Sequence, residues 1–176
     1  MEKNLEQKEA INKLKGMAAD INIGMLISRS FNGSLSTRPM ATIEVDSEGC
    51  VWFFSRKDSS KVREFGMDNK IELVYSHPGK DRYLDITGHV TVVYDREIIK
   101  AKWKPLVKAW FPAGAEDPDL CLLKVRPVQA HYWDNETGKM VEFGKMIASI
   151  VTGKRLAEGV EGTLIVKNDM GGQNYR

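Results

Sequence analysis

Residues 36–65 constrain the possible fold most strongly, because they place two strand-like runs and a helix start next to one another in the chain. The first run ends at a turn signal over residues 46–49 (Asp-Ser-Glu-Gly), and the second contains a Trp-Phe-Phe triplet. Apolar and aromatic runs separated by glycine turns are typical of antiparallel hairpins. Such a hairpin, followed by a helix, can bring Arg38, Ser60 and Lys61 to one point.

Turn-bounded apolar segments continue on both sides of this stretch. They predict strands at about residues 21–29, 35–45, 50–55, 71–76, 83–94, 120–125 and 128–133. Helices are expected at about 3–20, 58–67, 95–110 (broken before Pro105) and 139–152, followed by a tail over 153–176 with a short apolar run at 164–166. Pro39 predicts an edge strand or a bulge, and Gly88 predicts a bulge or a close backbone approach inside a long strand.

This pattern predicts a single domain over residues 1–176 with a mainly β (α+β) fold. There is no β-α-β alternation and no G-x-G-x-x-G motif, so a dinucleotide-binding fold is disfavoured. Six or seven antiparallel strands with helices at both ends favour a small closed or split β-barrel with Greek-key character.

The composition excludes several classes of partner. The formal net charge is only +2, which disfavours nucleic acid or a membrane surface as a partner, so any anion site must be local. No run approaches the roughly 20 apolar residues of a membrane-spanning helix, and the first six residues are polar and acidic. We therefore expect a cytoplasmic protein in which Cys50 and Cys121 are buried, reduced thiols.

The sequence lacks the common hydrolase, metalloprotease and Walker motifs, and it has no paired-cysteine metal signature, so no metal site is expected. The remaining candidate for a functional site is the group formed by Arg38, Ser60 and Lys61. Arginine grips phosphate with a planar fork, lysine adds a point charge, and a helix start presents free amides to an anion. From the spacing alone, the alternative is that the basic residues around Arg56 and Lys57 form a solvated surface. Single-stranded nucleic acid is disfavoured as a ligand of this region.

Seven short motifs give the chain a specific resemblance when they are taken in order over roughly residues 20–135. The chain resembles the FMN-binding split barrels related to pyridoxamine 5'-phosphate oxidase, in the branch of general stress protein 26. The motifs are Ser36-Thr37-Arg38-Pro39-Met40, Gly49-Cys50-Val51-Trp52-Phe53-Phe54-Ser55, Ser59-Ser60-Lys61-Val62, Tyr83-Leu84-Asp85-Ile86-Thr87-Gly88, Lys108-Ala109-Trp110-Phe111-Pro112, Asp117-Pro118-Asp119-Leu120 and Tyr132-Trp133-Asp134.

The resemblance implies a six-stranded antiparallel split barrel that forms a homodimer, with one FMN in each of two clefts between the subunits. It implies that the phosphate is held by an arginine, a serine and a lysine, that the backbone after the arginine lies beside the isoalloxazine ring, and that two aromatic residues reach the flavin of the partner subunit. Carried over residue by residue, the site residues are Arg38, Pro39, Met40, Ala41, Thr42, Phe54, Ser55, Ser60, Lys61, Trp110 and Phe111.

The chain also departs from this family, since its C-terminus (residues 167–176) lacks the Arg-Leu-x-Pro signature that helps to hold pyridoxal phosphate. Oxidation of vitamin B6 is therefore not expected, and no residue is marked as a catalytic acid or base. Two hypotheses stay open: an FMN-dependent oxidoreductase linked to stress, acting on an unknown substrate with a donor such as a reduced nicotinamide, and a non-catalytic flavin-storage or sensing module. A deazaflavin or FAD is the alternative cofactor, and haem is disfavoured.

Overall fold

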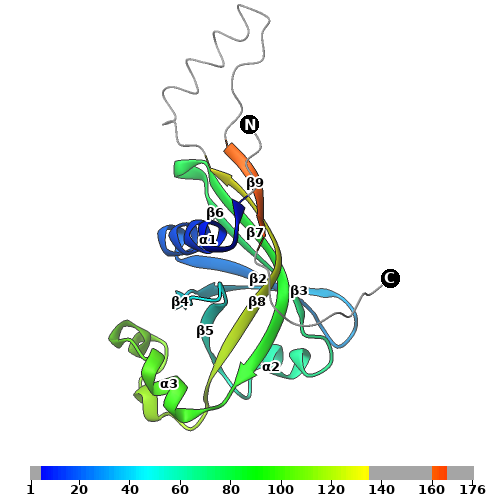
Figure 1. Ribbon diagram of the computed structural model, residues 1–176. Coiled ribbons are helices and arrows are strands. Elements are labelled where there is room, and N and C mark those ends of the chain that lie inside the picture. Colours follow the sequence, from blue (N-terminus) through cyan, green and yellow to red (C-terminus); the bar gives the residue numbers. More distant parts are fainter. Residues whose placement is uncertain (1–4, 135–159, 166–176) are drawn as a thin grey trace, which may run out of the picture.

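The structure, a computed structural model, describes residues 5–134 and 160–165. Its strands form one strongly curved, mostly antiparallel sheet (Figure 1). The strands are β1 Leu5–Glu6, β2 Ile23–Arg29, β3 Leu35–Ala41, β4 Glu44–Val45, β5 Val51–Arg56, β6 Lys70–His77, β7 Arg82–Val93, β8 Leu120–Asp134 and β9 Val160–Ile165. The helices are α1 Gln7–Ile21, α2 Ser60–Phe65 and α3 Arg96–Lys102, with 3-10 turns η1 Pro78–Lys80, η2 Pro105–Ala109 and η3 Gly114–Glu116.

Strand β8 is the centre of this sheet. One of its edges pairs with β7 along almost its whole length, whereas its other edge pairs first with β5 and then with β9. The sheet therefore splits where β8 passes from β5 to β9, and the order on the far side continues from β7 through β6 and β2 to the edge strand β3. The edge position of β3 agrees with its internal proline, because an edge strand can leave one side without donors.

The antiparallel split-barrel prediction is confirmed, with a correction in the number of strands. Seven strands of the described residues have six or more residues, in place of the six that the resemblance implied, because residues 160–165 of the tail, which include the first two residues of its apolar run, form β9. β9 pairs antiparallel with β8 and parallel with the short β1. The pattern of a single short run could not indicate this pairing, because both partners lie far away in the sequence.

The described helices agree with the sequence except at their ends and after Pro105, where the second half of the helix expected over 95–110 is the 3-10 turn η2. The helix expected at about 3–20 is α1, which begins later than expected because the chain before it forms β1. Asp95 caps α3 as expected, since its Oδ1 accepts hydrogen bonds from the amides of Glu97 (2.9 Å) and Ile98 (3.1 Å). The helix expected over 139–152 lies outside the described residues. Among the described helices none is long and apolar enough to cross a membrane.

Gly88 produces the bulge that the sequence predicted. It lies opposite Pro127 of β8, and the register of β7 and β8 shifts between Thr87 and Gly88. A Cβ atom at Gly88 would lie 2.4 Å from the carbonyl oxygen of Arg126, so only glycine fits there. Because the bulge accommodates a residue without an N–H donor, β8 continues through Pro127, and the expected division into two strands at 120–125 and 128–133 is wrong.

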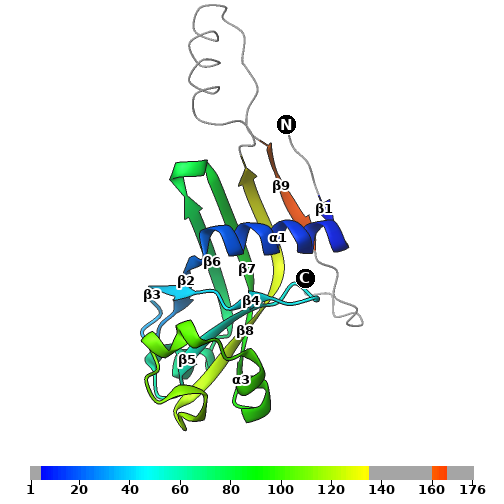
Figure 2. The ribbon, with the colours of Figure 1, turned by 90° about the vertical axis from the view of Figure 1, so that its left-hand side faces the viewer.

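Two separate hydrophobic cores lie on this framework. The main core joins the barrel strands to the inner face of α1, which crosses the sheet in Figure 2. The smaller core lies under residues 94–119, the segment between β7 and β8 that we call the arm; α3 of the arm lies at the end of the sheet away from β9 (Figure 1). Its buried members are Trp52, Phe54, Ile99, Leu120 and Leu122. Both expected free cysteines are buried.

An ionic network attaches α1 to β7 and β8. Arg82 donates to Asp134 (2.8 Å) and to Asp20 (3.0 Å), while Lys13 pairs with Asp134 and Lys80 with Asp20. The hydrogen bonds from Lys80 and Arg82 lower the pKa of Asp20. Burial alone would raise the pKa of Asp134, but its hydrogen bonds to Lys13 and Arg82 hold that pKa below its usual value. Both carboxylates are thus stabilised in the folded state.

We expect this network to make the fold sensitive to acid. Because the folded pKa of Asp134 lies below its unfolded value of about 3.9, its contribution is present above that pH and is lost as the pH falls further. Urea unfolding at pH 7 and pH 3 should show that Asp134→Asn lowers the unfolding free energy by about 2 kcal/mol at pH 7 and by less at pH 3. An equal loss at both values would contradict this assignment.

Candidate cofactor site

A cavity of about 510 Å³ opens between the sheet and the arm. This volume is in the range of small-molecule and cofactor sites. Its walls come from the end of α1, from β3 and the residues after it, from β5 and the start of α2, and from the arm. The lining residues are Ala19, Asn22, Pro39, Met40, Ala41, Thr42, Ile43, Phe54, Ser55, Arg56, Ser59, Lys61, Lys104, Leu106, Val107, Trp110 and Phe111.

The first wall is the end of β3, where the chain turns away from its partner strand. The expected strand at 35–45 is divided into β3 and β4 because the amides of the two residues between them bond elsewhere. Thr42 donates to the carbonyl oxygen of Asn22 (2.8 Å), and Ile43 donates to that of Trp52 (2.9 Å). Asn22 itself has a left-handed backbone (φ 68°), which asparagine tolerates, and it ends α1 beside the cavity.

One end of the cavity is rich in hydroxyl groups and positive charge. Ser55 is buried, Ser59 and Lys61 are half-buried, and Arg56 lies at the rim, where it pairs with acidic residues outside the cavity. Burial, followed by the charge of Arg38, lowers the pKa of Lys61. Among the described residues Lys61 has no carboxylate partner in an ion pair. The lowered pKa means that burial disfavours the charged ammonium group, and an anion beside it would stabilise that charge.

Arg38 is placed differently from the other predicted residues. Its guanidinium pairs with the buried carboxylate of Glu64 (3.0 Å) and also donates to Ser28 Oγ (2.5 Å) and to the carbonyl oxygen of Ser36 (3.0 Å). Arg38 does not line the cavity, although its charge reaches Lys61. The structure therefore shows Arg38 as a partner of a buried acid, and its role in phosphate binding stays a prediction.

The arm forms the opposite wall. Phe54 packs edge-on against Trp103, with ring centroids 5.5 Å apart, and lies 6.2 Å from the ring of Phe111. Leu106 and Trp110 lie at the mouth, where their side chains are 73% and 61% exposed. Phe111 and Trp110 therefore line the cavity of their own chain, and their predicted contact with a partner subunit stays a prediction.

The comparison with protein families shows which family the chain belongs to. A family model described as pyridoxamine 5'-phosphate oxidase like matches residues 9–157, most of the chain and all of the cavity. The chain belongs to this family.

The resemblance of this pyridoxamine 5'-phosphate oxidase-like chain to individual proteins is more distant. It is 28% identical over 163 residues to protein bli-3 of Neurospora crassa, covering 85% of this chain and 76% of that protein. A crystal structure of a general stress protein 26 from Jannaschia sp. CCS1 is 26% identical, with a TM-score of 0.69, covering 88% of this chain and 94% of that one. The general stress FMN/FAD binding protein of Xanthomonas citri is 28% identical, with a TM-score of 0.64, covering 74% and 92%.

Nine of the eleven predicted site residues of this family member line the cavity, and the other two, Arg38 and Ser60, do not. Ser60 starts α2 but is exposed, while its neighbour Ser59 faces the cavity. The sequence interpretation left out the eight other lining residues. Arg56 carried a signal, since it lies in the basic run that was assigned to the surface. Ser59 also carried a signal, because it lies in the same motif as Ser60. The six residues left, which belong to helix ends and loops without a motif, are Ala19, Asn22, Ile43, Lys104, Leu106 and Val107.

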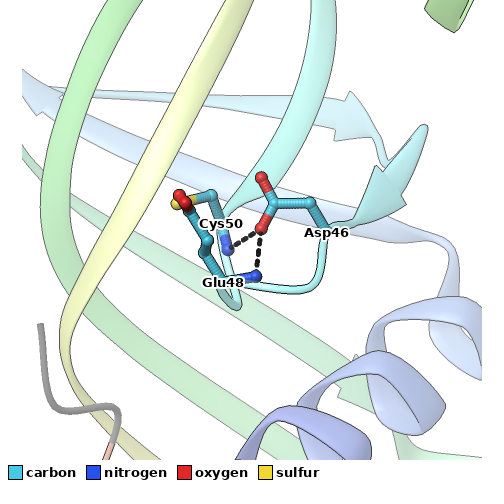
Figure 3. Close-up of side chains that lie close together, drawn as sticks. All are labelled: Asp46, Glu48 and Cys50. Carbon is cyan, nitrogen blue, oxygen red and sulfur yellow. Dashed lines mark hydrogen bonds between the residues drawn. The ribbon is translucent and has the colours of Figure 1, made fainter.

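A second group of polar side chains lies in the turn between β4 and β5 (Figure 3). The ligand atoms of Asp46, Glu48 and Cys50 lie within 4.8 Å of one another. However, Asp46 Oδ1 accepts the amides of Glu48 and Cys50 (both 2.9 Å), and its Oδ2 accepts the indole N–H of Trp52 (2.8 Å). Burial also raises the pKa of the Cys50 thiol. Hydrogen bonds of the turn therefore account for this group, and Gly49 completes the turn with a φ of 81°.

Proposed function

We propose that the chain binds FMN in this cavity. The observation that carries the proposal is Lys61, a half-buried cation without a carboxylate partner among the described residues, at the hydroxyl-rich end of a cavity with apolar walls. The 17 lining residues in the described part of the chain include three cations and no acid, which suits an anionic ligand. The FMN/FAD binding described for the relative from Xanthomonas citri supports a flavin.

In this proposal the phosphate lies at the end formed by Ser55, Ser59 and Lys61, where the ammonium group of Lys61 can donate to its oxygens. The hydroxyl of Ser59, which donates to the carbonyl oxygen of Arg56 (2.8 Å), would turn to the phosphate when it binds. Phe54 and Phe111 offer aromatic walls to the ring system. Bound FMN would supply the transfer of electrons or hydride, and the protein would supply binding, orientation and electrostatics. FMN is preferred to FAD because the hydroxyl-rich end holds a single half-buried ammonium group, that of Lys61, which suits one phosphate.

We also propose that two copies of the chain associate. The outward face of β2 and the nearby edge strand expose apolar side chains: Ile23 is 52% exposed, Met25 40% and Leu35 69%. On β2, Ile23 and Met25 alternate with the buried positions Gly24 and Leu26, and Leu35 of β3 pairs with the exposed Arg29, so all three lie on the face away from the core. An apolar sheet face of this kind favours a second protein surface. The exposed Trp110 at the cavity mouth suits a flavin shared between two subunits.

The reaction we propose is flavin-dependent oxidation or reduction of a small molecule, with a reduced nicotinamide as electron donor and a role in stress. The exposed mouth at Leu106 and Trp110 favours turnover over storage, because a second reactant could reach a ring bound there. The names of the general stress relatives support the link to stress.

Titration with FMN tests the proposal directly. We expect FMN to quench the tryptophan fluorescence of the protein with one FMN bound per chain, because Trp110 lines the cavity and Trp103 packs beside it. Riboflavin, which lacks the phosphate, should bind at least tenfold more weakly, and bleaching by a reduced nicotinamide would distinguish an enzyme from a storage protein. Unchanged fluorescence on addition of FMN, FAD or a deazaflavin would refute the flavin proposal.

A further inference from the structure

The cavity has two ends that differ in chemistry. The first is the hydroxyl-rich end at Lys61. The second lies where β3 ends, because the Nζ of Lys104 donates to the carbonyl oxygen of Ile43 (2.5 Å), and Ile43 in turn donates to Trp52 at the start of β5. Within β5, Trp52 lies four residues before Arg56, which is at the first end, and four residues of extended chain span about 13 Å. Lys61 and Lys104 thus mark opposite ends of the site.

Lys104 differs from the two lysines of α3. Lys100 pairs with Glu116 (3.1 Å), and Lys102 pairs with Glu44 and lies over the ring of Trp52. Lys104, in contrast, bonds a neutral carbonyl oxygen, and among the described residues no carboxylate forms an ion pair with it. Its positive charge is therefore not neutralised by an ion pair within the part of the chain that the structure describes, and the bond to Ile43 uses one of its three N–H donors.

We propose that Lys104 holds a positive charge at the ring end of bound FMN and raises the reduction potential of the flavin. This inference rests on the proposed function, since a phosphate at the Lys61 end directs the ring toward Lys104. Two electrons and one proton convert the neutral ring into a ring with one negative charge, so a nearby cation stabilises the reduced form more than the oxidised form. Charge near the ring nitrogens is a recognised way in which proteins tune a flavin.

The test compares Lys104→Met with Lys108→Met in the protein loaded with FMN. Both lysines are exposed on the same segment of the arm, but only Lys104 lines the cavity, so both variants should fold. We expect Lys104→Met to weaken the preference for reduced over oxidised FMN about tenfold, which lowers the midpoint potential of the two-electron couple by about 30 mV. Lys108→Met should keep the potential of the unchanged protein, and Lys104→Arg should restore it.

The potential is measured by titration against a reference dye at low salt and at 0.5 M salt. Because Lys104 is exposed, salt should reduce the difference between Lys104→Met and the unchanged protein. Equal potentials for these two proteins, or an equal fall in Lys108→Met, would overturn the inference while leaving FMN binding intact. A failure of the unchanged protein to bind FMN would instead overturn the proposed function, so the two failures are distinguishable.

Discussion

Lys61→Met is expected to weaken FMN binding about 10- to 100-fold, because hydrogen bonds to charged groups contribute about 1.5–3 kcal/mol. Methionine keeps the unbranched apolar stem of lysine, so the cavity wall changes little. The fold itself should not lose stability, since burial of the Lys61 ammonium lowers its pKa and shows that its charge is unfavourable without a ligand. FMN titration together with thermal unfolding checks both parts of this expectation.

Two comparisons make the Lys61 experiment specific. Lys57→Met removes a nearby charge that pairs with Asp119 (3.1 Å) outside the cavity, and it should leave FMN affinity within about twofold. Riboflavin affinity should be nearly the same in Lys61→Met as in the unchanged protein, because riboflavin has no phosphate. If Lys61→Met bound FMN as tightly as the unchanged protein, the assignment of the phosphate end would be wrong.

Arg38→Met separates the two candidate roles of that arginine. Its loss would leave the carboxylate of Glu64, which is only 6% exposed, without its positive partner, and would remove a donor to Ser28. We therefore expect a lower unfolding free energy for Arg38→Met, whereas Lys61→Met should mainly lower FMN affinity. A loss of FMN affinity with unchanged stability in Arg38→Met would support the phosphate-binding role that the sequence predicted.

Gly88→Ala should destabilise the fold by about 3 kcal/mol or more, since overpacking of a well-packed site costs 1–3 kcal/mol and sometimes more. The new Cβ would lie 2.4 Å from the carbonyl oxygen of Arg126, 3.1 Å from its carbonyl carbon and 3.2 Å from the Cα of Pro127. All three atoms are backbone, so relief requires a shift of the central strand pair β7–β8. Urea unfolding measures the effect.

Gly16→Ala is the matched control for this substitution. Gly16 lies on the exposed side of α1, and a Cβ there would meet no atom within 4 Å. Replacing a helical glycine by alanine should raise the unfolding free energy by about 0.5–1 kcal/mol. The same chemical change should therefore have opposite signs at the two positions. A mild effect at Gly88 would mean that the bulge can relax and that the close approach does not require glycine.

The elements that the sequence predicted well depend on local chemistry. The turn before β5 is encoded by Asp46, which accepts amides within the turn, and by Gly49, which supplies the positive φ. The start of α3 is encoded by its cap at Asp95. Gly88 indicated a bulge because a glycine inside a long strand often marks a bulge or a close backbone approach. The first two signals come from hydrogen bonds between residues close together in the chain. The third comes from one residue type, glycine, whose lack of a side chain permits a close backbone approach.

The predictions that were wrong or incomplete depend on partners far apart in the sequence. Pro127 suggested a strand break, but the bulge opposite it keeps β8 continuous. The pairing of Arg38 with Glu64 could not be read from a pattern, because their contact depends on how β3 and α2 pack. Lys104 lines the cavity through its bond to Ile43, which lies 61 positions earlier. These three features depend on tertiary packing, which leaves no periodic pattern in the sequence.

The two separate cores have a consequence for how this scaffold can change over time. The barrel depends on the main core, whereas the arm is anchored by the smaller core around Phe54 and Ile99. Substitutions at distant, independent sites have nearly additive effects on stability. Changes at the exposed arm positions Leu106 and Trp110 can therefore accumulate with little effect on the barrel. Proteins descended from one ancestral barrel could in this way acquire different substrates while they keep the cavity walls formed by β3 and β5.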